Sequence, residues 1–212
     1  MPTPSRTSTP EIVAAGRQIL EAEGFEGLTM QRVAAAVGVR APSLYKRVDG
    51  RSELLRLIAT DVLGELSLTL DAAVDGRDPK RDLAAIATAF RAFALANPEA
   101  YALLFRRRPD ADYTQPDPAW PGLETLFRTV EAIAGPADRL EAARTVVAWA
   151  NGFVSMELAG AFQMGGSVDR AFAFGAERIA VAISEPSGSA RRATGGTAPR
   201  RPRPKTGHRS PA

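Results

Sequence analysis

The spacing of apolar residues constrains the fold of this chain more than any other feature. Between residues 9 and 185, apolar side chains recur every three or four positions, and no run alternates apolar and polar residues over the length of a strand. Glycine and proline interrupt the pattern where helices are expected to end or begin. The sequence therefore predicts an all-α fold of about nine helices, with an N-terminal three-helix unit and a larger C-terminal helical domain.

Composition divides the chain into four predicted parts. Residues 1–8 form a short disordered arm, residues 9–56 a helix-turn-helix domain, and residues 57–185 a helical domain for effector binding and dimerisation. Pro, Gly, Ser and Arg dominate residues 186–212, which hold seven basic residues and no acidic one, so this tail is predicted to be disordered. Two roles stay open for the tail: an electrostatic arm for DNA, or a solvated extension without function.

The net charge of +3 conceals an uneven distribution. With the seven basic residues of the tail removed, the other 185 residues carry 20 basic and 24 acidic side chains, a net charge of −4. A prediction of nucleic-acid binding must therefore rest on a local basic patch, because the folded part of the chain is mildly acidic.

Several function classes lack the residues they need. The chain has no cysteine and one histidine, His208, which excludes thiolate chemistry, histidine triads and multi-histidine metal centres. No glycine-rich phosphate loop, paired-carboxylate motif or nucleophile elbow occurs, so we expect neither an enzyme nor a cofactor. No run of 18 apolar residues and no apolar signal core occurs, which predicts a cytoplasmic protein without a membrane partner.

Helix boundaries are expected at capping residues. Thr9 is the expected N-cap of a first helix over residues 10–23, which Gly24 ends, and Thr29 is the expected N-cap of the second. Residues 106–118 are expected to form a polar loop because they contain three prolines. The last three helices are expected over residues 119–135, 138–164 and 167–184.

Residues 29–50 have the organisation of a helix-turn-helix. Two short helical patterns are separated by Gly38-Val39-Arg40, where glycine permits the positive φ that a tight turn needs. The second helix is expected to enter the major groove of DNA, with its polar side outward. Small apolar residues are expected where the two helices cross, namely Ala34, Ala35, Val37 and Leu44.

The basic patch lies in this same segment. Five basic residues and one acidic residue between positions 29 and 51 give a local charge of +4. We expect Arg40, Ser43 and Lys46 to contact base edges, because they lie near the start of the second helix. The expected phosphate contacts are Thr29, Tyr45, Arg47 and Arg51. The alternative is a solvated basic face between packed helices.

Residues of about 10–56 resemble the DNA-binding domain of the TetR/AcrR family of regulators. The resemblance rests on ILEAEGFEGLTMQRVAAAVGVRAPSLYKRVDGRSELL, with its "GF-x-x-LT", "VA-x-x-VGV" and "SLYK" followed by "R-x-ELL". Where the family usually has His-Phe, this chain has Arg47-Val48. The resemblance implies a homodimer that binds a pseudo-palindromic operator, most often as a repressor. Residues 146–162 resemble a WHG-type C-terminal domain, with Trp149 and Gly152 present and Asn151 at the histidine position.

Large apolar residues in the C-terminal part are candidates for a pocket that binds a small apolar or amphipathic effector. An ordinary packed core is the alternative for each of them. Asn151, Glu157 and Gln163 are the polar candidates for orienting a ligand, although Glu157 is equally suited to an ion pair. The candidate pocket residues are Phe90, Phe93, Tyr101, Phe105, Trp120, Phe127, Trp149, Asn151, Phe153 and Met156.

Two apolar stripes near the C-terminus are candidates for a dimer interface. Two helices from each subunit would form a four-helix, two-fold interface, and the alternative is that the stripes pack inside one chain. The candidate interface residues are Leu140, Val147, Val154, Val168, Phe172, Gly175, Ile179 and Ile183.

These features favour a homodimeric repressor that an effector releases from operator DNA, with the fourth helix as the connection between the two domains. An enzyme and a helical protein–protein module are the competing classes. The first lacks catalytic motifs, and the second leaves the basic helix-turn-helix face without a role.

Overall fold

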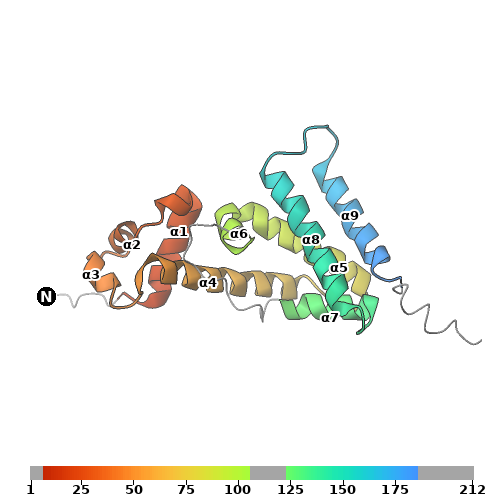
Figure 1. The fold of residues 1–212 in the computed structure, drawn as a ribbon, viewed down its shortest axis with the longest axis horizontal. Coiled ribbons are helices and arrows are strands. Elements are labelled where there is room, and N and C mark those ends of the chain that lie inside the picture. The colour runs from red at the N-terminus through yellow and green to blue at the C-terminus, as the bar shows by residue number, and fades with distance from the viewer. Residues whose placement is uncertain (1–6, 106–122, 186–212) are drawn as a thin grey trace, which may run out of the picture.

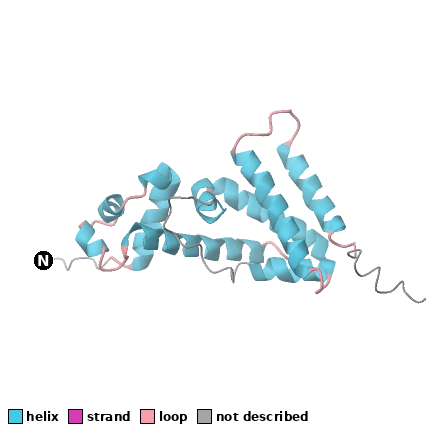
Figure 2. Cartoon of the chain, in the orientation of Figure 1, coloured by secondary structure: helices cyan, strands magenta, loops and turns pink. Residues whose placement is uncertain are grey.

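The computed structural model describes residues 7–105 and 123–185, and all the regular structure in these ranges is helical (Figure 2). The all-α prediction is confirmed. The molecule is elongated: α1, α2 and α3 lie at one end, α4 runs along its length, and α5, α7, α8 and α9 lie at the other end (Figure 1). The helices are α1 (Thr9–Gly27), α2 (Met30–Ala36), α3 (Ala41–Leu44), α4 (Gly50–Ala72), α5 (Pro79–Ala96), α6 (Pro98–Phe105), α7 (Glu124–Ala134), α8 (Arg139–Leu158) and α9 (Val168–Ala182).

The first helix begins at Thr9, and its N-cap is Ser8, one residue before the expected N-cap. Ser8 accepts a hydrogen bond from the backbone N–H of Glu11, and the Glu11 carboxylate accepts one from the backbone N–H of Ser8. Thr7 is buried, so Thr7 and Ser8 belong to the folded unit and not to the predicted arm. Gly24 breaks the helix with φ 71° as expected, but one further turn continues to Gly27 before the chain leaves for α2.

The last two helices begin within one residue of their expected starts but end earlier. Ser167 caps α9 by accepting from the backbone N–H of Arg170. The helix expected over residues 138–164 ends at Leu158, because Gly160 adopts φ 64° and turns the chain into an exposed loop. The loop predicted at 106–118, the start of the helix predicted at 119–135 and the tail at 186–212 lie outside the described residues.

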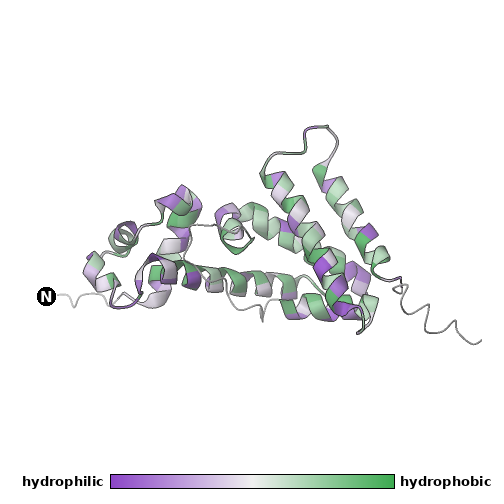
Figure 3. Cartoon of the chain, in the orientation of Figure 1, coloured by the Kyte–Doolittle hydropathy of each residue, from purple (hydrophilic) through white to green (hydrophobic). Residues whose placement is uncertain are grey.

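The core runs along α4 and joins the two ends of the molecule. Leu54, Leu55, Ile58 and Val62 are buried, and Figure 3 shows hydrophobic residues along the length of α4. Helix α4 packs against α1 and α5, and α5 packs in turn against α7, α8 and α9. One helix thus connects the predicted DNA-binding end with the C-terminal helices.

An aromatic contact fixes α9 against its neighbours. The rings of Trp149 and Phe172 stack with centroids 5.0 Å apart. Gly175 lies directly beneath the indole, since a Cβ atom at this position would lie 2.5 Å from Trp149 Cζ2. The close approach of α9 to Trp149 therefore depends on the absence of a side chain at position 175.

Substituting Gly175→Ala should lower the free energy of unfolding by about 1–3 kcal/mol, because the added methyl group overpacks the site beneath Trp149. Urea unfolding measures the change. Gly64→Ala is the matched control: nothing lies within 4 Å of its Cβ position, so it should stabilise α4 by about 0.5–1 kcal/mol. Equal stability of the two variants would contradict the packing described here.

Candidate nucleic-acid interface

Short-range hydrogen bonds shape the helix-turn-helix. Thr29 caps α2 as predicted, its Oγ1 accepting from the backbone N–H of Arg32 at 3.3 Å. Gly38 adopts φ 71° in the turn, and the N–H of Val39 donates to the carbonyl of Ala34 at 2.9 Å. The chain is then directed into α3, which begins at Ala41.

Apolar residues hold this unit together from beneath. Val33, Leu44 and Val48 are almost completely buried. Val48 thus packs in the core at one of the two positions where the sequence departs from the family pattern. Of the residues expected at the helix crossing, Ala34 is buried, but Ala35 is exposed, because it lies on the outer side of α2.

The opposite side presents polar and basic side chains to solvent. Arg40, Ser43, Lys46 and Arg47 are exposed, and Tyr45 is 55% exposed although its ring is apolar. Arg40 is the N-cap residue of α3, and Ser43 lies within this helix. Tyr45, Lys46 and Arg47 follow in the turn after α3.

The five cations of the basic patch differ in their partners. Arg32 forms an ion pair with Glu23, and Arg51 donates to backbone carbonyls of Phe25 and Leu28. Within the described ranges, the side chains of Arg40, Lys46 and Arg47 form no ion pair or hydrogen bond. These three charges are therefore the ones available to a phosphate or a base edge.

Arg47 also lies near the start of α1. The pKa of Glu11 is lowered chiefly because the backbone N–H of Ser8 donates to its carboxylate, and the charge of Arg47 contributes to the shift. The basic patch therefore borders the N-terminal turn of α1.

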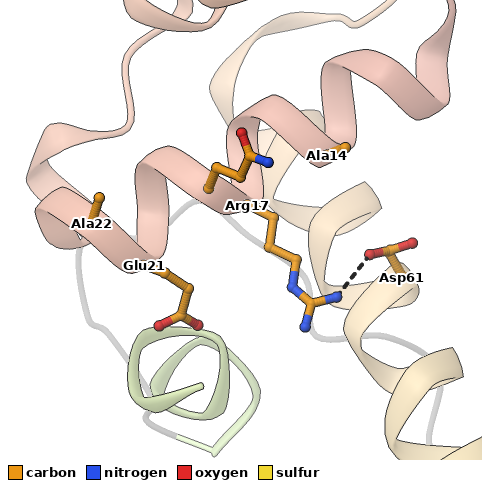
Figure 4. Close-up of a pocket in the computed structure, with 6 residues that line it drawn as sticks. Ala14, Arg17, Glu21, Ala22 and Asp61 are labelled. Carbon is orange, nitrogen blue, oxygen red and sulfur yellow. Dashed lines mark hydrogen bonds and ion pairs between the residues drawn. The ribbon is translucent and has the colours of Figure 1, made fainter. Parts of the chain in front are cut away.

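A cluster of polar side chains around Arg17 joins the helix-turn-helix end of the molecule to the C-terminal helices. Arg17 of α1 donates to Asp61 of α4 at 3.3 Å and to Asn97, just before α6, at 3.1 Å. It also forms an ion pair with Glu65. Arg17 and Asp61 line an open cleft of about 590 Å³ between α1 and α4. Figure 4 shows Arg17 reaching across to Asp61.

Glu21 of α1 adds a further contact to α6 by capping the start of that helix. Its two carboxylate oxygens accept from the backbone N–H groups of Glu99 at 3.2 Å and Ala100 at 2.7 Å. Figure 4 shows the carboxylate pointing from α1 toward α6. A negative charge is favourable there, because the first N–H groups of a helix have no partner within the helix. Sequence patterns did not reveal this contact, since its partners are 78 and 79 residues apart.

The predicted pocket residues separate into different groups. Phe90, Tyr101 and Phe105 form one aromatic cluster, with ring centroids 5.1–6.2 Å apart. Trp149 and Phe153 belong to a second cluster around Phe172.

The remaining pocket candidates lie elsewhere. Phe93 is buried in the main core, and the Phe127 ring lies near the guanidinium of Arg139. Met156 is 49% exposed on α8, so it lies apart from the two aromatic clusters. Trp120 lies outside the described residues.

The three polar candidates for ligand contact all have partners within the chain. The hydroxyl of the buried Tyr101 lies 2.7 Å from Asn151 Oδ1 and 2.8 Å from Ser155 Oγ, which joins α6 to α8. Gln163 donates to the carbonyl of Gly160.

Glu157 has the ion-paired role that the sequence left open. Its carboxylate accepts from Arg91 Nε at 2.7 Å, and Asp169 accepts from the same guanidinium. Glu157 raises the pKa of Arg91 by this hydrogen bonding, so the group ties α5 to α8 and α9 as a fixed cation.

The predicted dimer stripe faces the interior of the chain. Val154 is buried and Phe172 is only 2% exposed, while Gly175 lies beneath Trp149. Val147, Ile179 and Ile183 pack against the main core, and Val168 is half-buried. Most of this stripe therefore packs within its own chain, and its assignment to a subunit interface stays a prediction. Only Leu140 among the candidates is exposed.

A different set of apolar residues covers the outer side of the last two helices. Met156 lies there on α8, and Phe174 and Val181 lie there on α9, with Phe174 61% exposed. The same helices were expected to carry an interface, but their exposed sides differ from the predicted ones. Among the described residues, no helix is both long and apolar enough to cross a membrane.

Comparisons with known proteins agree on one family. The model for bacterial regulatory proteins of the tetR family matches residues 12–58. The model described as the tetracyclin repressor-like C-terminal domain matches residues 83–179. The WHG-type assignment stays a prediction.

Individual relatives match parts of the chain. The HTH-type transcriptional regulator Rv1816 of Mycobacterium tuberculosis (strain ATCC 25618 / H37Rv) is 34% identical over 110 residues, covering 50% of this chain and 47% of that relative. The HTH-type transcriptional repressor DrrR1 of Streptomyces coeruleorubidus is 48% identical over 60 residues, or 26% of this chain and 22% of the relative. The chain thus spans at most about half the length of these relatives.

A solved structure shows the same fold. A variant of TetR from Acinetobacter baumannii AYE, in complex with minocycline, aligns with a TM-score of 0.64 at 23% identity. The alignment covers 84% of this chain and 96% of that chain.

Replacing Glu21 with alanine should loosen α6, because two backbone N–H groups at its start would lose their acceptor. We expect faster amide exchange at Glu99 and Ala100 and a free energy of unfolding lower by about 1–3 kcal/mol. Hydrogen exchange and urea unfolding measure the two effects. Glu26→Ala, at an exposed position near the end of the same helix, is the control. Unchanged exchange at both amides in Glu21→Ala would show that the cap does not hold α6.

Proposed function

We propose that this chain, which belongs to the TetR family of bacterial regulatory proteins, is a transcriptional regulator that binds operator DNA through α3 and the turn after it. One observation carries the proposal. Arg40, Lys46 and Arg47 are exposed and form no ion pair or hydrogen bond among the described residues, while Leu44 and Val48 in the same segment are buried. Buried apolar residues thus support a cationic outer side, which suits a segment that enters the major groove.

The exposed residues divide into two proposed roles. Arg40, Ser43 and Lys46 are placed to contact base edges, and Tyr45 and Arg47 to contact phosphates. The Thr29 hydroxyl accepts from Arg32 N, which leaves its own proton free to be donated to a phosphate oxygen. The helix N-cap and the DNA contact are therefore compatible at this position.

A homodimer fits both the fold and the exposed apolar residues. We define the α8–α9 face as Met156 on α8 together with Phe174 and Val181 on α9, all of them exposed. A two-fold axis beside these helices would bury the same residues of both copies. Two recognition segments would then contact two half-sites about one DNA turn apart, which a single chain cannot do.

Repression relieved by an effector is the regulatory mode we propose. The name of DrrR1 as a repressor supports repression, and the minocycline complex of a protein with the same fold supports ligand binding, which we place in the C-terminal domain. Helix α6 would transmit the signal: Tyr101 joins it to Asn151 of α8, and Glu21 and Arg17 join its start to α1. An effector that shifts α6 would thereby change the position of α1 in each subunit.

DNA binding is tested by fluorescence anisotropy at about 150 mM salt, on the duplex that flanks the chain's own gene and on a scrambled duplex. We expect binding to the first to be tighter by ~10³-fold or more. Tyr45→Ala and Lys46→Ala should each weaken it by about 1–3 kcal/mol, since each removes a direct contact. Arg77→Ala removes a charge beyond the far end of α4 and should have no effect. Weak, equal binding to both duplexes that neither substitution changes would argue against the proposal.

The dimer is tested by introducing a charge into the α8–α9 face. Phe174→Glu should convert a dimer into a single chain of 22.5 kDa, because burying two unpaired carboxylates at a two-fold interface is unfavourable. Sedimentation equilibrium measures the mass. Leu68→Glu on α4, where the leucine is also exposed, is the matched control and should remain dimeric. A Phe174→Glu variant with the mass of the wild type would refute this interface.

A further inference from the structure

Arg51 at the start of α4 makes contacts within its own chain that a residue serving only to bind a DNA phosphate would not need. Its Nε donates to the carbonyl of Leu28 at 2.8 Å, and its Nη2 donates to the carbonyl of Phe25 at 2.5 Å. Its guanidinium carbon lies 4.0 Å from the centroid of the Phe25 ring. One edge and one face of the guanidinium are therefore engaged within the chain, although sequence reasoning assigned Arg51 to a DNA phosphate.

These contacts fall on the joint between α1 and α2. Phe25 and Leu28 are buried, and they lie between the break in α1 at Gly24 and the N-cap of α2 at Thr29. The Phe25 carbonyl also accepts from the backbone N–H of Leu28, and the carbonyl end of a helix attracts a cation. Arg51 supplies that cation from α4, 23 and 26 residues further along the chain.

We propose that Arg51 is a positioning residue, which holds the α1–α2 joint against α4 and thereby sets the angle at which α2 and α3 meet DNA. This role rests on the proposed function in operator binding. It differs from a phosphate contact in what the side chain must provide. A phosphate contact needs a positive charge, whereas this joint needs a planar fork and a flat face, which arginine has and lysine lacks.

The test compares Arg51→Lys with the wild type on the preferred duplex and on its scrambled counterpart, over a series of salt concentrations. Lysine keeps the charge, so a phosphate ligand would tolerate the change, but it loses the paired donors that hold both carbonyls. Arg56→Lys, an exposed position one turn further along α4, is the matched control. Thermal unfolding verifies that each variant is folded at the assay temperature.

A positioning role predicts that Arg51→Lys lowers the preference for the operator by about tenfold or more, while binding to scrambled DNA and the salt dependence stay unchanged. Arg56→Lys should behave as the wild type. The reason is that nonspecific binding needs only the positive charges of the protein, whereas base contacts also need α2 and α3 to meet DNA at the correct angle.

Two results would overturn the inference. If Arg51→Lys keeps the affinity and preference of the wild type, the side chain serves only as a charge. If it weakens binding to both duplexes by the same factor, Arg51 stabilises the fold without orienting the recognition segment. A wild type without any preference between the duplexes would refute the operator-binding proposal, and the positioning role with it.

Discussion

The contacts of α1 determine where the exposed cationic side chains of the helix-turn-helix lie. This helix packs against α2, α4 and α6, so it touches the recognition unit, the connecting helix and the C-terminal domain. Gly16 allows the close approach to α4, since a Cβ atom there would lie 3.0 Å from Ile58 Cδ1. Arg51 holds one end of α1, and Arg17 and Glu21 hold its middle. Packed and hydrogen-bonded contacts therefore connect α6 to the helix-turn-helix.

Features that depend on neighbours in sequence were predictable. Thr29 caps α2 because its side-chain oxygen meets an N–H group three residues ahead. Gly38 supplies the turn between the two short helices for the same local reason. Where two adjacent residues were equally suited, as at the start of α1, sequence alone selected the wrong N-cap: Thr9 in place of Ser8.

Features that depend on distant partners were not predictable. The apolar period of α9 correctly indicates that one side is buried, but a period does not say whether the same chain or a second copy covers it. Phe172 is covered by Trp149 and Phe153 of its own chain, so the exposed side with Phe174 becomes the candidate interface. Arg17 and Asp61 are 44 residues apart, and Arg91 and Glu157 are 66 apart, so only the folded arrangement brings their charges together.

The central claim is that a pair of these chains binds a specific DNA sequence through two α2–α3 units. Selection from random-sequence duplex DNA by the full chain, at about 150 mM salt, tests it most directly. The account predicts enrichment of two inverted copies of one short sequence, with centres about 10–10.5 base pairs apart or a whole multiple of that spacing. A selected pool in which no shared sequence emerges would contradict sequence-specific binding, and a single uninverted copy would contradict the dimer.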